Sequence, residues 1–133
     1  MMHHSEHGVI ENNYARIEGG AVYIMADENI FTMNGGIIRN NTAYYNGGAI
    51  SCFEYRREQD WLLSHSLIYI NGGIIADNQA EYGLGGAIYW EQFSPLYLSN
   101  CTITGNSAPR NHGGGIYVTT KSYGLHLSGT VNV

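Results

Sequence analysis

The sequence has little charge, little proline and no long apolar run. Charged residues make up 13% of the 133 residues, and 6 Lys and Arg stand against 11 Asp and Glu, which gives a formal net charge of −5. Without a basic stripe to neutralise phosphates, nucleic acid is not an expected partner. No apolar stretch approaches the roughly 20 residues of a membrane-spanning helix, so we expect no membrane span in this chain.

The first seven residues also lack a recognisable signal. Residues 1–7 do not show the basic, apolar and small-residue regions of a secretion signal peptide. His3, His4, His7 and Glu6 carry atoms that can bind a metal, but they lie outside any repeated pattern and gain no rigid geometry from it. We therefore expect a disordered leader over residues 1–7, no metal site and no cofactor.

Glycine is the abundant residue type, with 18 copies against 2 prolines, and 44% of the residues are hydrophobic. The glycines do not recur at every third position, so they do not indicate collagen. The hydrophobic content argues against wholesale disorder. This composition favours a folded chain with many tight turns.

One sequence motif occurs four times along the chain. It reads Ile-x-x-Asn-x-Ala, then four or five residues, then Gly-Gly, a small residue, a β-branched residue and usually Tyr. The copies begin at Ile10, Ile38, Ile75 and Ile103, which lie 28, 37 and 28 positions apart. Internal repeats of this length are typical of solenoids and other repeat folds.

Each repeat predicts three short strands, because a second alternating run lies between one Gly-Gly and the next Ile-x-x-Asn. Strands this short can stack in parallel about 4.8 Å apart and bury a continuous core. The sequence thus predicts an all-β fold, a parallel β-helix of about four coils of roughly 28 residues, over residues 8–133. Alternation predicts four inward columns: Phe31, Ile68, Leu96 and Leu125; Met33, Ile70, Leu98 and Leu127; Ile10, Ile38, Ile75 and Ile103; Val22, Ile50, Ile88 and Ile116.

The residues around the repeated Asn predict a sharp corner. The position before it holds residue types that tolerate a left-handed backbone: Asn12, Asn40, Asp77 and Gly105. The next position is Asn in every repeat, and stacked side-chain amides can hydrogen-bond from coil to coil. We therefore predict a structural asparagine ladder made of Asn13, Asn41, Asn78 and Asn106.

The paired motifs also point to a family. Ile-x-x-Asn-x-Ala with Gly-Gly-Ala-Ile resembles the right-handed parallel β-helix repeats of bacterial surface and adhesin-like proteins, and is similar to the Phe-x-x-Asn and Gly-Gly-Ala-Ile repeats of chlamydial polymorphic outer membrane proteins. Ile stands here where those proteins usually carry Phe. The resemblance covers residues 8–133 and implies a right-handed coil in an exported bacterial stalk or passenger, extracellular or at the cell surface, with no catalytic residues to carry over.

Both ends of the sequence fall inside a repeat. The chain begins a strand at residues 8–10 and stops in another at residues 130–133, and no polar cap covers either edge. Solenoids generally need such caps. We therefore expect a fragment with flanking repeats of a longer protein.

One insertion interrupts the rhythm at residues 53–66, where charges of both signs meet aromatic side chains. Such a loop can bind a glycan, because sugars offer hydroxyls to carboxylates and apolar faces to aromatic rings. A solvated connecting loop is the other interpretation. The candidate ligand-binding residues are Tyr55, Arg56, Arg57, Glu58, Asp60, Trp61 and, from the neighbouring coil, Glu91.

Two functions remain open. The first is a non-catalytic solenoid segment, adhesin-like or stalk-like, that presents loops to a glycan or host-surface ligand. The second is a fragment of a polysaccharide-active enzyme, such as a lyase, a glycosidase or a phage tail-spike, because the loop carboxylates could supply the pair that glycosidases hold roughly 5 to 9.5 Å apart. These carboxylates do not occupy matched positions in adjacent strands, where a rigid site would be built, which favours the first.

The remaining aromatic and sulfur-containing residues give structural expectations. Tyr23, Tyr89 and Tyr117 form an outward column that is either a binding platform or a strand-stabilising stack. Trp90 falls in an inward column and is expected in the core. Cys52 and Cys101 lie two coils apart, beyond the roughly 7 Å Cα limit for a disulfide, so both are expected to be free thiols.

Overall fold

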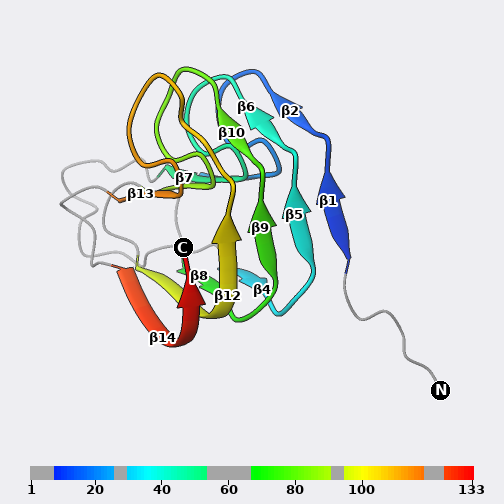
Figure 1. Cartoon of the computed structure of the whole chain (residues 1–133), viewed down its shortest axis with the longest axis vertical. Coiled ribbons are helices and arrows are strands. Elements are labelled where there is room, and N and C mark those ends of the chain that lie inside the picture. Colours follow the sequence, from blue (N-terminus) through cyan, green and yellow to red (C-terminus); the bar gives the residue numbers. More distant parts are fainter. Residues whose placement is uncertain (1–7, 26–29, 54–66, 91–94, 119–124) are drawn as a thin grey trace.

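A computed structural model describes residues 8–25, 30–53, 67–90, 95–118 and 125–133, and these residues form fourteen strands. Every strand pairing among them is parallel. No helix in these ranges is long and apolar enough to cross a membrane. The chain is thus built from short strands that wind into stacked coils (Figure 1).

The strands fall into three sheets. The largest has the order β1 (Val9–Glu11), β5 (Ile37–Arg39), β9 (Ile74–Ala76), β12 (Leu96–Thr104), β8 (Leu67–Ile70) and β4 (Ile30–Met33), and β14 (Leu125–Asn132) also pairs with β12. The second holds β2 (Tyr14–Ala15), β6 (Thr42–Ala43) and β10 (Gln79–Ala80). The third holds β3 (Val22–Met25), β7 (Ile50–Phe53), β11 (Ile88–Trp90) and β13 (Ile116–Val118).

The predicted columns are the columns of the structure. Ile38 pairs with Ile10 on one side and with Ile75 on the other, and Ile75 pairs with Ile103. The Phe31, Met33 and Val22 columns are likewise in the predicted register. A right-handed parallel β-helix of four coils is therefore confirmed. We number the coils 1 to 4 by their ladder residues Asn13, Asn41, Asn78 and Asn106.

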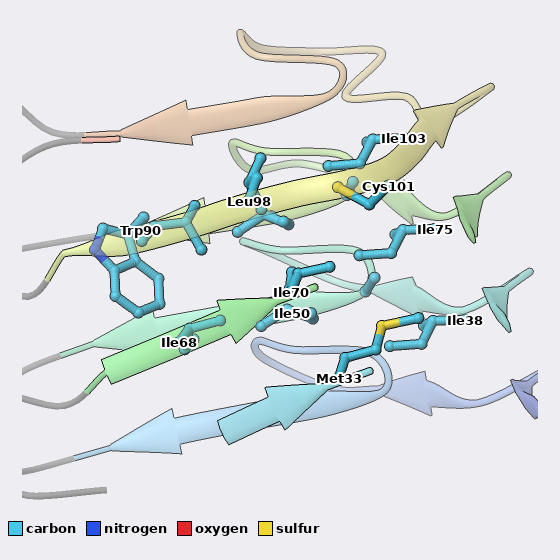
Figure 2. Packing of buried hydrophobic residues seen from close by; sticks show 14 of the residues in the cluster. Met33, Ile38, Ile50, Ile68, Ile70, Ile75, Trp90, Leu98, Cys101 and Ile103 are labelled. Carbon is cyan, nitrogen blue, oxygen red and sulfur yellow. The ribbon is translucent and has the colours of Figure 1, made fainter. Parts of the chain in front are cut away.

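The core runs along the axis of the coils. Ile38, Ile75 and Ile103 lie above one another along one side of it, and Trp90 is fully buried at the other (Figure 2), which confirms the core position expected for this tryptophan. The inward columns are not buried along their whole length, since Leu127 is 58% exposed. It belongs to the last described strand, where a neighbouring strand covers it on one side only.

The corner before each repeated asparagine has the predicted left-handed backbone. The φ angle is 61° at Asn12, 56° at Asn40, 57° at Asp77 and 67° at Gly105. Two residues after the ladder position, Ala43 and Ala80 are fully buried. The corner thus has room for a methyl group and for little more.

The two glycines of each Gly-Gly pair have different structural roles. The first glycine turns the chain with a positive φ, as at Gly47, where φ is 68°. The second passes another backbone closely, and a Cβ added to Gly48 would lie 2.1 Å from the carbonyl oxygen of Gly86 and 2.5 Å from the amide nitrogen of Gln79. Glycine is therefore required at both positions by backbone geometry.

One expected corner is absent in the third coil. Three separate strands per coil were predicted, but β12 runs through from Leu96 to Thr104. In coils 1 and 2 an Asn-Gly-Gly turn separates the strands, with φ at 88° for Gly36 and 89° for Gly73. In β12, Asn100 takes the positive φ of 50° and pairing with β14 resumes at Cys101 after a shift in register. A bulge here replaces the turn.

Cys52 and Cys101 are both buried and free, as the spacing predicted. Burial raises the pKa of the Cys101 thiol, since the charged thiolate loses its hydration in the core.

Candidate functional site: a tyrosine patch on the coil rim

The residues predicted to form a glycan groove fall outside the part of the chain that the structure describes. Tyr55, Arg56, Arg57, Glu58, Asp60 and Trp61 lie within residues 54–66, and Glu91 lies within residues 91–94. The leader at residues 1–7 is also outside the described ranges. The insertion site therefore stays a sequence prediction.

The four corner asparagines are hydrogen-bonded from coil to coil. In coil 2, the backbone N–H and the side-chain Nδ2 of Asn41 both donate to Oδ1 of Asn78, at 2.9 and 3.0 Å. Asn13 donates in the same way to Asn41, and Asn78 to Asn106. The amides also donate inward to corner carbonyls, as Asn78 does to Ile38 at 3.1 Å. Their hydrogen-bonding capacity is used within the fold.

The tyrosine column of the third sheet is less open than expected. Tyr89 pairs with Ser51 and Tyr117, as predicted, but it is only 6% exposed and its ring stacks on Tyr117 at 5.8 Å and 6°. Ser51 is buried and donates through Oγ to the Glu18 carboxylate at 2.9 Å, to which Asn46 donates at 2.8 Å. Tyr89 and Tyr117 pack their rings on one another, which favours the stabilising interpretation for these two residues, whereas Tyr23 is 47% exposed.

A second aromatic column, not identified from the sequence, crosses the largest sheet. The rings of Tyr69 and Tyr97 stack at 5.0 Å and 12°, and those of Tyr97 and His126 at 4.8 Å and 20°. Stacked rings use their faces on one another and leave their edges to solvent. The ring faces between neighbouring members, including both faces of Tyr97, are therefore covered within this stack.

A third aromatic group has a different geometry and is the best candidate site. It lies on the rim between the asparagine corner and the Gly-Gly turn, and we call it the tyrosine patch: Tyr14, Ile17, Tyr44, Tyr45, Tyr82 and Arg110. All four coils contribute to it. One residue four positions after each ladder asparagine forms its central column: Ile17, Tyr45, Tyr82 and Arg110.

The rings of the patch do not stack in parallel. Tyr44 meets Tyr45 edge to face at 4.8 Å and 89°, and it meets Tyr82 at 4.7 Å with a tilt of 39°. The Arg110 guanidinium lies 4.4 Å above the Tyr82 ring. Tyr45 is 48% exposed and Tyr82 is 44% exposed. Large aromatic surfaces thus face solvent beside a positive charge.

Backbone hydrogen bonds hold the patch to the coils. The Tyr45 amide donates to the Ile17 carbonyl at 2.7 Å, and the Tyr82 amide donates to the Tyr44 carbonyl at 2.9 Å. The side chains therefore project from neighbouring coils whose separation is fixed. A site on such a rigid support keeps its geometry better than one on a free loop.

The charges around the patch act on Tyr14, which is 59% exposed. Partial desolvation and the Glu81 carboxylate, which accepts a hydrogen bond from the phenol, raise the pKa of Tyr14 above its ordinary value. Arg16 lies close enough to oppose this shift. Tyr14 in coil 1 thus interacts with Glu81 in coil 3, across the intervening coil 2.

The sequence held a signal for this patch that was not used. The fourth position after each ladder asparagine carries a large side chain in every coil, but its residue type varies among the coils. A search for identical residues misses such a column. Its members become neighbours only through the register of the coils.

The acidic residues of the described ranges do not form a catalytic arrangement. Glu11 accepts from Arg39 at 2.8 Å, Glu18 accepts from Asn46 and Ser51, and Glu81 accepts from Tyr14. Asp77 lies in the left-handed corner. None of the four recurs at the same position of an adjacent coil. Within these ranges, no group of three His, Cys, Asp or Glu side chains could hold a metal ion.

Comparison with known proteins agrees with this architecture. The family model described as "Right handed beta helix region" matches residues 1–131. Searches among curated proteins and among solved structures gave no significant match. Because the family match spans nearly the whole chain and the strands form stacked parallel coils, this chain belongs to the right-handed β-helix family.

Proposed function

We propose that this chain is a non-catalytic segment of an extracellular or cell-surface bacterial β-solenoid, adhesin-like or stalk-like, that binds a glycan or host-surface ligand. The observation that carries the proposal is the tyrosine patch, an exposed group of aromatic rings and an arginine contributed by all four coils. Tyrosine and arginine are the side chains that most often dominate binding surfaces. The repeats similar to those of polymorphic outer membrane proteins support the same location and role.

The right-handed β-helix family contains enzymes as well as non-enzymes. A polysaccharide lyase or glycosidase would need carboxylates converging on a bound sugar. Three of the four acidic residues of the described ranges bind partners within the fold instead, as Glu18 does with Asn46 and Ser51. This distribution supports binding over catalysis.

The test compares the patch with the insertion on a panel of immobilised polysaccharides. Tyr45→Ala removes an exposed ring from the patch, and Trp61→Ala removes the aromatic ring proposed for the insertion. Tyr97→Ala is the matched control, since it deletes a tyrosine from the stacked column on another face. Circular dichroism verifies that each variant is folded.

We expect binding to be lost in Tyr45→Ala and kept in Tyr97→Ala. Loss in Trp61→Ala alone would move the binding site to the insertion. Release of new reducing ends or unsaturated sugars from the polysaccharides would instead support the enzyme. Absence of binding by the parent chain to any glycan or host-surface preparation would leave a structural spacer and contradict the proposal.

A further inference from the structure

We infer that Asn34 and Asn71 are sites of spontaneous deamidation, and that Asn46 is protected by the fold from the same reaction. Each of these asparagines precedes a glycine, and no other asparagine of the chain does. Because the three Asn-Gly pairs share their sequence, a difference in their reactivity must come from their surroundings. The surroundings differ in the backbone amide that attacks, in the side chain that is attacked and in the exposure of both.

The reaction requires an available backbone amide after the asparagine. The nitrogen of the following glycine attacks Cγ of the asparagine, the Cγ–Nδ2 bond breaks, and the amide proton passes to the departing nitrogen, which leaves as ammonia. The five-membered succinimide that remains then takes up one water molecule and opens to aspartate or to isoaspartate. Glycine favours the ring closure, because it has no Cβ to hinder the approach or to restrict the backbone.

The attacking amides of the two exposed pairs are available. Within the described ranges, neither the Gly35 amide nor the Gly72 amide donates a hydrogen bond. The turn itself is attached to the neighbouring coil, because the Asn71 amide donates to the Met33 carbonyl at 2.7 Å. The nucleophile is thus free in a turn whose position is fixed.

The side chains that react are exposed and hydrogen-bonded to one another. Asn34 and Asn71 both face solvent, and Nδ2 of Asn71 donates to Oδ1 of Asn34 at 3.0 Å. This donor lies at the oxygen on which negative charge develops when Gly35 attacks, and such a donor stabilises that charge. For Oδ1 of Asn71, the donor in the described part of the chain is the Ser99 hydroxyl, at the longer distance of 3.4 Å. Asn34 should therefore react faster than Asn71.

Asn46 has the same neighbour in sequence and the opposite surroundings. The Gly47 amide donates to the Leu84 carbonyl at 2.9 Å, so the nucleophile is already engaged. The Asn46 side chain is held at both ends, since Nδ2 donates to Glu18 at 2.8 Å and Oδ1 accepts from the Leu84 amide at 2.9 Å. Gly47 is also buried. The ring can therefore close only after a local opening of the structure.

The products change the corner that carries Asn34 and Asn71. Aspartate at both positions replaces a hydrogen-bonded amide pair with two carboxylates on adjacent coils, and like charges at this separation repel one another. Isoaspartate also lengthens the backbone beside a close approach, where a Cβ added to Gly73 would lie 2.6 Å from the Gly36 carbonyl oxygen. Deamidation therefore weakens the contact between coils at this outer corner.

The experiment follows all three asparagines in one sample by peptide mass spectrometry. The full chain is incubated at mildly alkaline pH in water labelled with heavy oxygen, once folded and once in denaturant. The heavy oxygen marks the products formed during the incubation, and labelling by an isoaspartyl methyltransferase identifies isoaspartate. The variants are Asn71→Ala and the reciprocal control Asn34→Ala, and circular dichroism verifies that both are folded.

In denaturant we expect similar rates at the three positions. In the folded chain Asn34 should react first and Asn71 second, and Asn46 should react at least about tenfold more slowly than Asn34, because it must first open. Asn71→Ala should slow the reaction at Asn34 about fivefold, which is the effect of one lost hydrogen bond on a rate. Asn34→Ala should not slow the reaction at Asn71, because Asn71 is the donor of that pair.

Two results would overturn the inference: equal rates at Asn34 and Asn46 in the folded chain, or no modification of Asn34 and Asn71 under conditions in which the unfolded chain reacts. An unchanged rate at Asn34 in Asn71→Ala would overturn the role of the Asn71 amide as the donor. None of these results depends on a ligand, so they are independent of the proposed function.

Discussion

Two regions separated by only a few residues behave in opposite ways. The corner residues Asn41 and Ala43 are buried and are Asn and Ala in every coil, whereas the rim at Tyr44 and Tyr45 is more exposed and its residue types vary among the coils. At the corner each coil touches the coils above and below through backbone and amide groups. At the rim, side chains face outward. Stacking therefore fixes the corner residues and leaves the rim residues available for a ligand.

The largest effect on stability should come from the Gly-Gly turn, where the backbones of neighbouring coils pass most closely. In Gly48→Ala the new methyl group would meet two backbone atoms, at 2.1 and 2.5 Å, which cannot move without separating the coils. We expect a loss of more than about 4 kcal/mol in unfolding free energy, or failure to fold, as measured by denaturation.

Gly114→Ala is the matched control for that substitution. Gly114 occupies the same position in coil 4, but the nearest atom to an added Cβ is 3.5 Å away. Its effect should stay within about 1 kcal/mol. Equal effects of the two substitutions would show that close approach does not explain the second glycine.

A smaller effect is expected at high pH from the buried thiol. Because burial raises the pKa of Cys101 in the folded chain, its contribution to stability is complete below the ordinary thiol pKa and is lost as the pH rises through the raised value. Denaturation between neutral and alkaline pH should show a steeper loss for the parent than for Cys101→Ala. Parallel curves would contradict this role for the thiol.

The smallest effect on stability should come from the rim. Tyr45→Ala and Ile17→Ala remove exposed side chains, so each should change the unfolding free energy by less than about 0.5 kcal/mol. Denaturation followed by circular dichroism measures this directly. A loss as large as that at the corner would mean that the patch stabilises the coils, and its exposure could then not be attributed to ligand binding.

The sequence predicted the parts of the fold that recur in every coil. Four inward columns and the left-handed positions before Asn13, Asn41, Asn78 and Asn106 follow from period and residue type, and the structure contains both. The run of β12 through an expected corner could not be predicted. It depends on which residue takes the positive φ: Asn100 in β12, but the second glycine, Gly36 or Gly73, in the two Asn-Gly-Gly turns.

The candidate binding surface was harder to predict for a related reason. The tyrosine patch unites unlike residues that become neighbours only when the coils are aligned, and the burial of Tyr89 depends on packing across coils. The binding site was predicted in the insertion because residues 53–66 interrupt the repeat. The rim keeps the repeat length and varies only in its side chains.

The central claim is that the buried asparagine ladder, and not asparagine at corners in general, holds the coils together. Asn78 is fully buried and bonds to Asn106 and Ile38, whereas Asn71 is exposed and donates to Asn34 at 3.0 Å on the outside of another corner. Equilibrium denaturation of Asn78→Ala and Asn71→Ala compares the same substitution at a buried and at an exposed corner asparagine. We predict a loss of about 1 to 3 kcal/mol for Asn78→Ala and less than about 0.5 kcal/mol for Asn71→Ala. Equal losses, or a larger loss for Asn71→Ala, would contradict the account.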